Sequence, residues 1–312
     1  MIGLGAMGAE MLRAAVPHPD FAVRLAADLS AGTVARRRAD FPAVTFTTDP
    51  AEVLDSPELD AVYIATPPAH HADLAVAALR SGKAVFCEKP LAISLADGER
   101  MLAAARESGL ATAVNYSLSD RNATLELARV LDHGEAGRVV GVELRLRFPV
   151  WPRAFQADAT WLAERAQGGF LREVFSHFAY LTDRLLGELT PVHLDVTYDQ
   201  ARPNGSETAV DALFRAGGVP VHVSGLSGVV GPELYEWTLW GDRRSYQLRD
   251  WTRLFVHDGG DWAPVALSAE SGSEATRLTL FAAAVRGERP ANLADFAAAL
   301  RVRRVVEACH QS

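Results

Sequence analysis

The residues at the start of the chain have the types and spacing that bind a phosphate group. Residues 3–8 read Gly-Leu-Gly-Ala-Met-Gly, a G-x-G-x-x-G pattern, and an apolar helix-like run from Ala9 to Val16 follows. In a dinucleotide-binding turn the first glycine makes the tight bend, the second lets a pyrophosphate approach and the third lets the helix pack on the sheet. The free N–H groups of that helix bind phosphates. The residues expected to contact a dinucleotide here are Gly3, Gly5, Ala6, Met7 and Gly8.

An acidic residue follows at the distance that suits ribose recognition. Asp28 ends a short apolar run that begins at Phe21, and it lies 20 residues after Gly8. A carboxylate at this point accepts hydrogen bonds from adenosine ribose hydroxyls and repels a 2′-phosphate, so NAD is favoured over NADP. The alternative interpretation is a surface aspartate in a strand-to-helix loop. The triplet Arg36–Arg38 lies one helix further on and is less well placed to reach this site.

A lysine follows another short apolar strand candidate, Ala84 to Cys87. The sequence continues Glu88-Lys89-Pro90, and ligands of parallel sheets bind at the carboxyl ends of the strands. An ammonium group there can donate to a substrate hydroxyl and stabilise the alkoxide that develops, or tune the pKa of a neighbour. The alternative is a surface lysine in a proline turn.

Glu173 and His177 are spaced i, i+4 in a helix expected from Phe170 to Leu186, so they share one face of it. Histidine can take up an alcohol proton because its pKa lies near working pH. A carboxylate one turn away can orient the imidazole and favour its charged form. The alternative for His177 is a histidine of the core.

These residues need elements to position them, and the first 117 residues supply alternating strands and helices. Continuous apolar strands between helices indicate a parallel sheet covered on both faces. We therefore assign residues 1–117 to an NAD(P)-binding Rossmann domain of the α/β class. Its strand candidates after the glycine turn are Phe21–Asp28, Val44–Thr47, Asp60–Thr66, Ala84–Cys87 and Ala111–Asn115.

The second half of the sequence has a different pattern of predicted elements. Alternating strand candidates joined by glycine-rich turns predict a large, mostly antiparallel open sheet with one face covered by helix. We assign residues 118–312 to an α+β domain for substrate binding and oligomerisation, whose final helices can pack back on the first domain. The strand candidates include Arg138–Phe148, Val192–Tyr198, Thr208–Arg215, Val219–Leu226 and Tyr235–Trp240.

Composition excludes several classes of protein. The chain has 312 residues, 49% of them hydrophobic and 22% charged, and a net charge of −8; these values fit two globular domains and argue against disorder. Nothing suggests a nucleic-acid groove or a membrane span. Cys87 and Cys309 do not form a disulfide framework, and no Cys/His cluster has metal-ligand spacing. We expect a cytoplasmic protein that uses no metal.

The stretch from Asp60 to Leu91 resembles the glucose–fructose oxidoreductase / inositol dehydrogenase family, often called Gfo/Idh/MocA. It contains DAVYIATPP, then His71, then VFCEKPL, and the family's marks are a TP…H loop after the fourth strand and a Glu-Lys-Pro loop after the fifth. The likeness covers essentially the whole chain. Its later parts are Asn115-Tyr116, Trp161–Gly169, Tyr235–Leu248 and Phe281–Pro290.

The resemblance implies roles for single residues. Glu173 and His177 take the places of the acid and the histidine in the family's Asp-x-Gly-x-His, which line the substrate pocket, and the Lys89–Pro90 bond would be cis. Further cofactor contacts would come from Thr66, Pro67, His71, Glu88, Lys89 and Asn115. Substrate contacts would come from Lys89, Tyr116, Trp161, Glu173 and His177.

Some positions depart from the family pattern. Glu173 replaces an aspartate, Phe175 replaces a glycine, and Tyr180 stands where an acid often follows. We therefore expect a bulkier and more apolar pocket than a typical polyol site. Ser117 and Asp120 replace the family's arginine and proline after Asn115-Tyr116, which leaves the contacts of that loop open.

The main hypothesis is an NAD(P)-dependent oxidoreductase that interconverts a secondary alcohol and a ketone on a sugar, polyol or related small molecule. Lys89 and His177 would be catalytic, with Glu173 in support, and the resemblance implies a homodimer or homotetramer. One alternative is a non-catalytic NAD(P)-binding sensor or regulatory protein of the same fold. A hydrolase is disfavoured because Ser176 is not in a nucleophile elbow.

One feature conflicts with the dinucleotide fold. The strand before the glycine turn needs about five residues, but only Met1 and Ile2 precede Gly3. We expect a truncated first strand and hypothesise that the true start lies upstream of Met1. Otherwise the neighbouring strands lose pairing partners, and stability and cofactor affinity should suffer.

Overall fold

The apolar strands of the first half form the expected parallel sheet in a computed structural model, which describes residues 1–156, 159–267 and 271–311. Every residue of its central strand β4 is buried, as a strand covered on both faces should be. All pairings are parallel: β1 with β2, β3 with β4, and β4 with β5. The strands are β1 (Leu25–Ala27), β2 (Thr45–Thr47), β3 (Ala61–Ile64), β4 (Ala84–Cys87) and β5 (Thr112–Val114).

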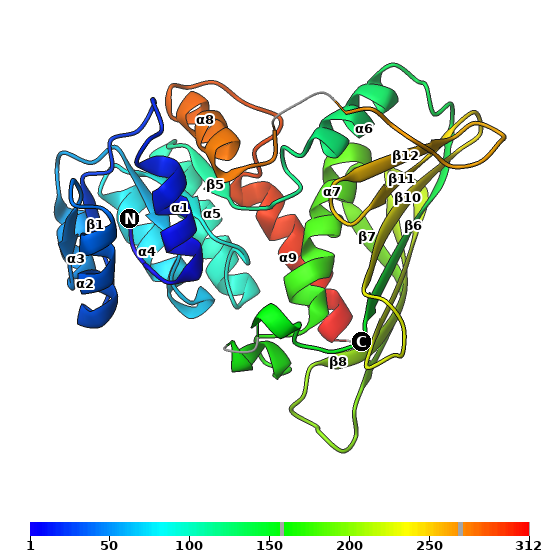
Figure 1. Ribbon diagram of the computed structural model, residues 1–312, viewed down its shortest axis with the longest axis horizontal. Coiled ribbons are helices and arrows are strands. Elements are labelled where there is room, and N and C mark those ends of the chain that lie inside the picture. The colour runs from blue at the N-terminus through cyan, green and yellow to red at the C-terminus, as the bar shows by residue number, and fades with distance from the viewer. Residues whose placement is uncertain (157–158, 268–270, 312) are drawn as a thin grey trace. The chain divides into compact units, whose positions relative to one another are not determined.

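Helices connect and cover these strands (Figure 1). Four of them begin at side chains that accept a backbone N–H of the first turn, Ser30, Asp49, Ser94 and Ser273, which satisfies a donor that the helix itself leaves free. The helices are α1 (Ala6–Ala15), α2 (Ala31–Asp40), α3 (Pro50–Asp55), α4 (His71–Arg80), α5 (Leu95–Ser108) and α8 (Glu274–Val285).

The first strand is reduced to a single bridging residue, Ile2, which pairs in parallel with both Ala27 of β1 and Ile64 of β3. Its N–H donates to Tyr63 O at 2.8 Å, and its carbonyl accepts from Ala65 N at 2.8 Å. Ile2 therefore joins β1 and β3 and brings the glycine turn to the carboxyl end of both strands.

A cavity of about 80 Å³ lies next to this bridge. Met1, strands β1 and β3, and apolar side chains of α1 and α8 line it, among them Met11 and Phe281. The Met1 amine donates to Leu25 O at 2.6 Å, and burial lowers the pKa of this amine to about 5. The cavity at this end of the sheet is therefore lined mostly by apolar side chains.

The second half forms an eight-stranded sheet in the order β13-β12-β11-β10-β6-β9-β8-β7. Its pairings are antiparallel except that of β6 with β9, which is parallel, so the prediction of a mostly antiparallel open sheet is confirmed. The strands are β6 (Val139–Phe148), β7 (Leu189–Tyr198), β8 (Glu207–Ala216), β9 (Val219–Ser227), β10 (Leu234–Gly241), β11 (Ser245–Arg249), β12 (Arg253–His257) and β13 (Ala263–Pro264).

One helix packs along this sheet and carries the expected acid and histidine. Helix α7 (Ser176–Leu186) follows a π-helical turn at Leu171–Phe175, and the Trp237 indole N–H of β10 donates to the Thr182 hydroxyl at 2.9 Å. Turns of π-helix inside α-helices occur often at functional sites. The remaining helices are α6 (Asn122–Asp132) and α9 (Phe296–His310).

The chain divides into two compact units: unit 1 holds Met1–Asp120 with Gly272–Leu300, and unit 2 holds Arg121–Ser271 with Arg301–Ser312.

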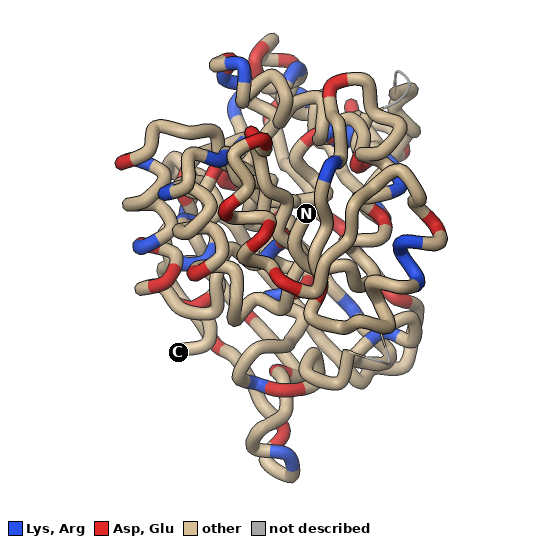
Figure 2. Tube along the Cα trace, turned by 90° about the vertical axis from the view of Figure 1, so that its left-hand side faces the viewer, with Lys and Arg blue, Asp and Glu red and all other residues tan. Residues whose placement is uncertain are grey.

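Figure 2 shows basic and acidic residues interspersed along the trace. Within the described ranges, no helix is both long enough and apolar enough to cross a bilayer.

Candidate active site

The glycine turn of unit 1 has the geometry that its sequence predicts. Gly3 has φ +93°, and a Cβ there would lie 2.5 Å from the backbone of Ala65. A Cβ on Gly8 would lie 2.1 Å from Gly3 O. Gly5 differs, because a Cβ on it would meet no atom within 4 Å. Two glycines are thus required by the fold itself, and the third borders open space at the N-terminus of α1, where a pyrophosphate would approach.

Gly5→Ala should therefore separate cofactor binding from folding. We expect the variant to fold as stably as the parent protein but to bind NADH at least roughly tenfold more weakly, about 1.4 kcal/mol, because the added methyl group occupies the phosphate approach. Fluorescence titration with NADH and thermal unfolding measure the two quantities. Gly260→Ala is the matched control, because a Cβ there also meets nothing within 4 Å. Equal NADH affinity of Gly5→Ala and the parent would contradict this assignment.

Asp28 lies at the end of β1 and connects to the glycine turn. Its two carboxylate oxygens accept the N–H groups of Leu4 and Ser30, each at 2.8 Å. Arg37 of α2 also reaches the turn and donates to Leu4 O at 3.3 Å, so the expectation that the arginine triplet lies too far along was wrong. The cause is the direction of α2, which brings Arg37 back over the turn. The Asp28 carboxylate repels a 2′-phosphate, whereas the Arg37 guanidinium attracts it.

The loop after β3 holds Thr66, Pro67 and, at the start of α4, His71. The buried Thr66 hydroxyl has no hydrogen-bond partner in the part of the chain that the structure describes, and a buried hydroxyl without a partner is costly unless a ligand supplies one. The His71 ring lies between two carbonyl oxygens, Thr66 O and Pro90 O, at 2.9 Å from each. Burial lowers the pKa of His71. His71 thus ties this loop to the loop of Lys89, and Pro67 is exposed.

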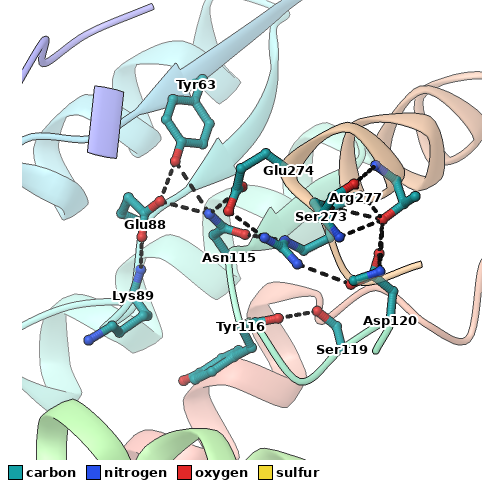
Figure 3. Close-up of polar contacts among 12 residues, drawn as sticks. Tyr63, Glu88, Lys89, Asn115, Tyr116, Ser119, Asp120, Ser273, Glu274 and Arg277 are labelled. Atoms are coloured by element: carbon teal, nitrogen blue, oxygen red, sulfur yellow. Dashed lines mark hydrogen bonds and ion pairs between the residues drawn. The ribbon is translucent and has the colours of Figure 1, made fainter. Parts of the chain in front are cut away.

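Glu88 is the centre of a buried hydrogen-bond network at the carboxyl ends of β3, β4 and β5 (Figure 3). Its carboxylate accepts the Tyr63 hydroxyl and, at 2.8 Å, the amide of Asn115. Burial raises the pKa of the Glu88 carboxyl, and burial together with the nearby Glu88 charge raises the pKa of Tyr63. Both cofactor candidates, Glu88 and Asn115, therefore already bond to protein groups and support the surrounding loops.

Helix α8 completes this network through Arg277, whose side chain is 3% exposed. Its guanidinium donates to Asn115 Oδ1 at 2.7 Å and to Asp120 at 3.1 Å, and it forms an ion pair with Glu274. A buried charge is tolerated when it is paired and hydrogen-bonded on all sides. Asp120, which departs from the family pattern, is thus the partner of an arginine that follows it by more than 150 residues.

Lys89 follows Glu88 and leaves the network. Its N–H donates to Glu88 Oε2 at 3.3 Å, whereas its ammonium group points away from the Glu88 carboxylate in Figure 3. The Lys89–Pro90 bond is cis, as the resemblance implies. Tyr116, a substrate candidate, is 2% exposed, and its carbonyl accepts the Ser119 hydroxyl. In the loop that follows β4, the Lys89 ammonium group therefore lies outside the buried network.

In unit 2, a buried carboxylate fixes the start of the helix that carries the acid and the histidine. Glu207 of β8 is fully buried and accepts the Leu171 N–H at 2.6 Å. Gly169 has φ +96°, and a Cβ there would lie 2.1 Å from Glu207 Oε2. Burial raises the pKa of the Glu207 carboxyl to about 7. Gly169 is thus explained by the close approach of Glu207, whereas Gly168 is explained by the backbone of Leu162, whose carbonyl oxygen would lie 2.3 Å from a Cβ there.

Glu173 lies in the π-helical turn and pairs with residues of the preceding loop. Its Oε1 accepts the Gln156 amide at 3.0 Å and lies 3.5 Å from the Arg153 guanidinium. Arg153 also donates to the Tyr235 hydroxyl at 3.1 Å. Neither Arg153 nor Gln156 could be expected from the sequence, because neither is part of a motif. Glu173 therefore carries a charge that is partly compensated inside unit 2.

His177 is 6% exposed and lies against an aromatic side chain that sequence reasoning missed, Trp251. Their ring centroids are 5.2 Å apart, and the planes meet at 83°. Phe175 is 2% exposed and stacks on Phe214 of β8 with 5.9 Å between ring centroids, so its ring contributes to the core against the sheet. Trp161 is 37% exposed in a short 3₁₀ helix, Thr160–Ala163.

The residues of unit 1 fit a dinucleotide on two structural grounds. The glycine turn leaves open space at Gly5, and the buried Thr66 hydroxyl lacks a protein partner. A search of the described residues finds no group of three His, Cys, Asp or Glu side chains that could hold a metal ion. Cys87 and Cys309 are both buried free thiols.

Comparison with protein families gives two matches along the chain. A model described as "Oxidoreductase family, NAD-binding Rossmann fold" matches residues 1–116, and a model described as "GFO/IDH/MocA C-terminal domain" matches residues 124–247. The two matches cover the elements that carry Lys89 and His177.

Individual relatives are sugar reductases. Over 42% of its length the chain is 35% identical to 1,5-anhydro-D-fructose reductase of Ensifer adhaerens, and the match spans 39% of that protein. Over 83% of its length it is 29% identical to dTDP-3,4-didehydro-2,6-dideoxy-α-D-glucose 3-reductase of Streptomyces violaceoruber, spanning 79% of that protein. A solved 3-ketoreductase from Actinomadura kijaniata, in complex with NADP and TDP-benzene, shares the fold with a TM-score of 0.83 at 22% identity, covering 99% of this chain and 95% of that one.

Proposed function

Because the chain belongs to the Gfo/Idh/MocA oxidoreductase family, we propose that it is an NAD(P)-dependent oxidoreductase that interconverts a secondary alcohol and a ketone on a sugar, polyol or related small molecule. The observation that carries the proposal is Lys89, whose ammonium group points away from the buried network and which follows β4 of the parallel sheet whose first βα connection is the glycine turn. Two of the relatives, from Ensifer adhaerens and Streptomyces violaceoruber, are named as reductases of sugar derivatives, and these names support the substrate class.

We propose that the dinucleotide is NAD, held by the glycine turn, Asp28 and the Thr66 hydroxyl. The Asp28 carboxylate keeps lone pairs free after it accepts two N–H groups, and these can bind ribose hydroxyls. Arg37 and the NADP in the 3-ketoreductase structure favour the opposite preference. The ratio of kcat/KM for NADH and NADPH decides between them.

The proposed mechanism gives each polar residue one task. Lys89 donates a hydrogen bond to the reacting oxygen and stabilises negative charge on it. His177 takes up or returns the hydroxyl proton, and Trp251 and the helix restrict the orientation of its ring. Glu173, held by Arg153 and Gln156, places a carboxylate one helical turn from His177 and favours the charged imidazole. The nicotinamide, when bound, supplies the hydride acceptor or donor.

We further propose that residues 1–117 and 118–312 act as cofactor and substrate domains in a cytoplasmic homodimer or homotetramer. The exposed valines Val140 and Val192 lie on strands β6 and β7 of the large sheet, and we place the interface between copies on this sheet. Light scattering would determine the number of copies.

A screen for redox activity tests the proposed function. NADH and NADPH oxidation would be followed with keto-sugars and keto-inositols, and NAD and NADP reduction with sugars and inositols. We expect turnover with at least one pair. Cofactor binding without turnover across the whole panel would favour the alternative, a sensor or regulatory protein.

A further inference from the structure

The turn between β11 and β12 holds two residues in a backbone conformation that favours glycine. Asp250 has φ 49° and Trp251 has φ 68°, and throughout the described ranges no other non-glycine residue has a positive φ. Tight hairpins that require this conformation usually contain Asn-Gly or Asp-Gly. For a bulky aromatic residue it is an outlier, and outliers of this kind cluster at ligand sites. The backbone conformation of Trp251 therefore suggests a role for this residue in ligand binding.

Several contacts keep the turn in place. The Asp250 N–H donates to Tyr235 O at 3.0 Å, and the Asp250 carboxylate forms an ion pair with Arg253. The Trp251 ring packs on Phe178 and Tyr235, with centroid distances of 5.0 Å and 5.3 Å. These contacts thus hold Trp251 in a backbone conformation that a tryptophan would not favour by itself.

This turn brings the indole to the proposed acid–base residue. The Trp251 ring meets the His177 ring nearly at right angles, 5.2 Å between centroids. His177 is almost fully buried, whereas Trp251 is only partly buried, so Trp251 keeps some exposed surface. The Tyr235 hydroxyl next to it accepts from Arg153, the ion-pair partner of Glu173. Trp251 is therefore part of one connected cluster with the acid and the histidine.

We propose that Trp251 is a substrate-binding residue that selects ring-shaped sugars. The proposal rests on the proposed function. The uncovered part of the indole packs against the apolar C–H face of a pyranose ring, and the contact with His177 restricts the imidazole to one orientation. An acyclic polyol offers no flat apolar face, so it gains little from the indole. Aromatic contacts of this kind favour association by about tenfold.

The test uses two variants of the full-length protein. Trp251→Gly suits the left-handed backbone and removes the indole, so the turn should remain folded. Trp251→Phe keeps an aromatic ring. Trp240→Ala is the matched control, since Trp240 lies on β10 of the same sheet and packs on Trp262. NADH affinity and circular dichroism show whether each variant is folded, and kcat and KM are measured with a pyranose and an acyclic polyol.

For Trp251→Gly we expect KM for the pyranose to rise about tenfold and KM for the acyclic polyol to stay nearly unchanged. We expect Trp251→Phe to recover most of the loss and Trp240→Ala to behave like the parent. Equal losses for both substrates, or unchanged kinetics in a folded Trp251→Gly, would overturn the role of Trp251 while the proposed function stands. A parent protein without turnover on any sugar or polyol would overturn the proposed function itself.

Discussion

Lys89→Ala is expected to lower kcat by roughly 10³-fold and to leave NADH affinity nearly unchanged. Removing one preformed donor to a developing oxyanion costs about 10²–10³ in kcat, and Lys89 also supplies the positive charge. The Lys89 side chain takes no part in the hydrogen bonds of Glu88 to Tyr63 and Asn115, so these two bonds remain in the variant. Steady-state kinetics and an NADH titration measure the two effects.

Two further variants, Lys89→Arg and Lys83→Met, test this prediction more specifically. Lys89→Arg keeps the charge but changes the shape and donor geometry of the group, so it should recover only part of the activity. Lys83→Met is the control, because Lys83 is buried before β4 and donates to Ser81 O; turnover per folded molecule should not change. A Lys89→Ala variant with full turnover would remove Lys89 from the mechanism.

His177→Ala is expected to have the second largest effect, a loss of roughly 10³-fold in kcat/KM at neutral pH. Positioned proton transfer contributes about 10²–10⁴-fold, and His177 is the histidine whose ring contacts Trp251. The variant leaves space beside Trp251 that a small base can enter. Added imidazole should therefore restore part of the activity.

Kinetics with and without imidazole check this expectation. His222→Ala is the control, because His222 is exposed on β9 of the same sheet. Loss of activity in the His177 variant without any recovery by imidazole, together with lost secondary structure, would indicate a core histidine. Unchanged activity of a folded His177→Ala would show that another group transfers the proton.

The parts of the fold that depend on local patterns could be predicted from the sequence. Most strands of the parallel sheet are short apolar runs between helices, and a pattern over a few residues is enough to recognise them. The same holds for the glycine turn, where Gly3 and Gly8 are required by contacts with their own neighbours. The resemblance to the family located Glu88-Lys89-Pro90 and its cis bond.

Contacts between distant residues could not be predicted. Asp120 and Arg277 pair across more than 150 residues, and no local pattern relates them. Arg37 reaches the glycine turn because of the direction of α2, which the spacing of the triplet does not reveal. Trp251 was missed because Asp-Trp is not a turn signal, and its backbone conformation is unusual for tryptophan. Residues that break local rules for the sake of a site are the ones that sequence reasoning misses.

The most direct test of the central claim is transfer of the hydride itself. A sugar or polyol found active in the screen would be prepared with deuterium on the carbinol carbon and incubated with NAD and the protein, and the reduced cofactor would be analysed by mass spectrometry. The proposed function predicts one deuterium in the NADH, and almost none of this product with Lys89→Ala. NADH without deuterium, or cofactor that stays oxidised although it binds, would contradict an oxidoreductase that acts on a carbinol carbon.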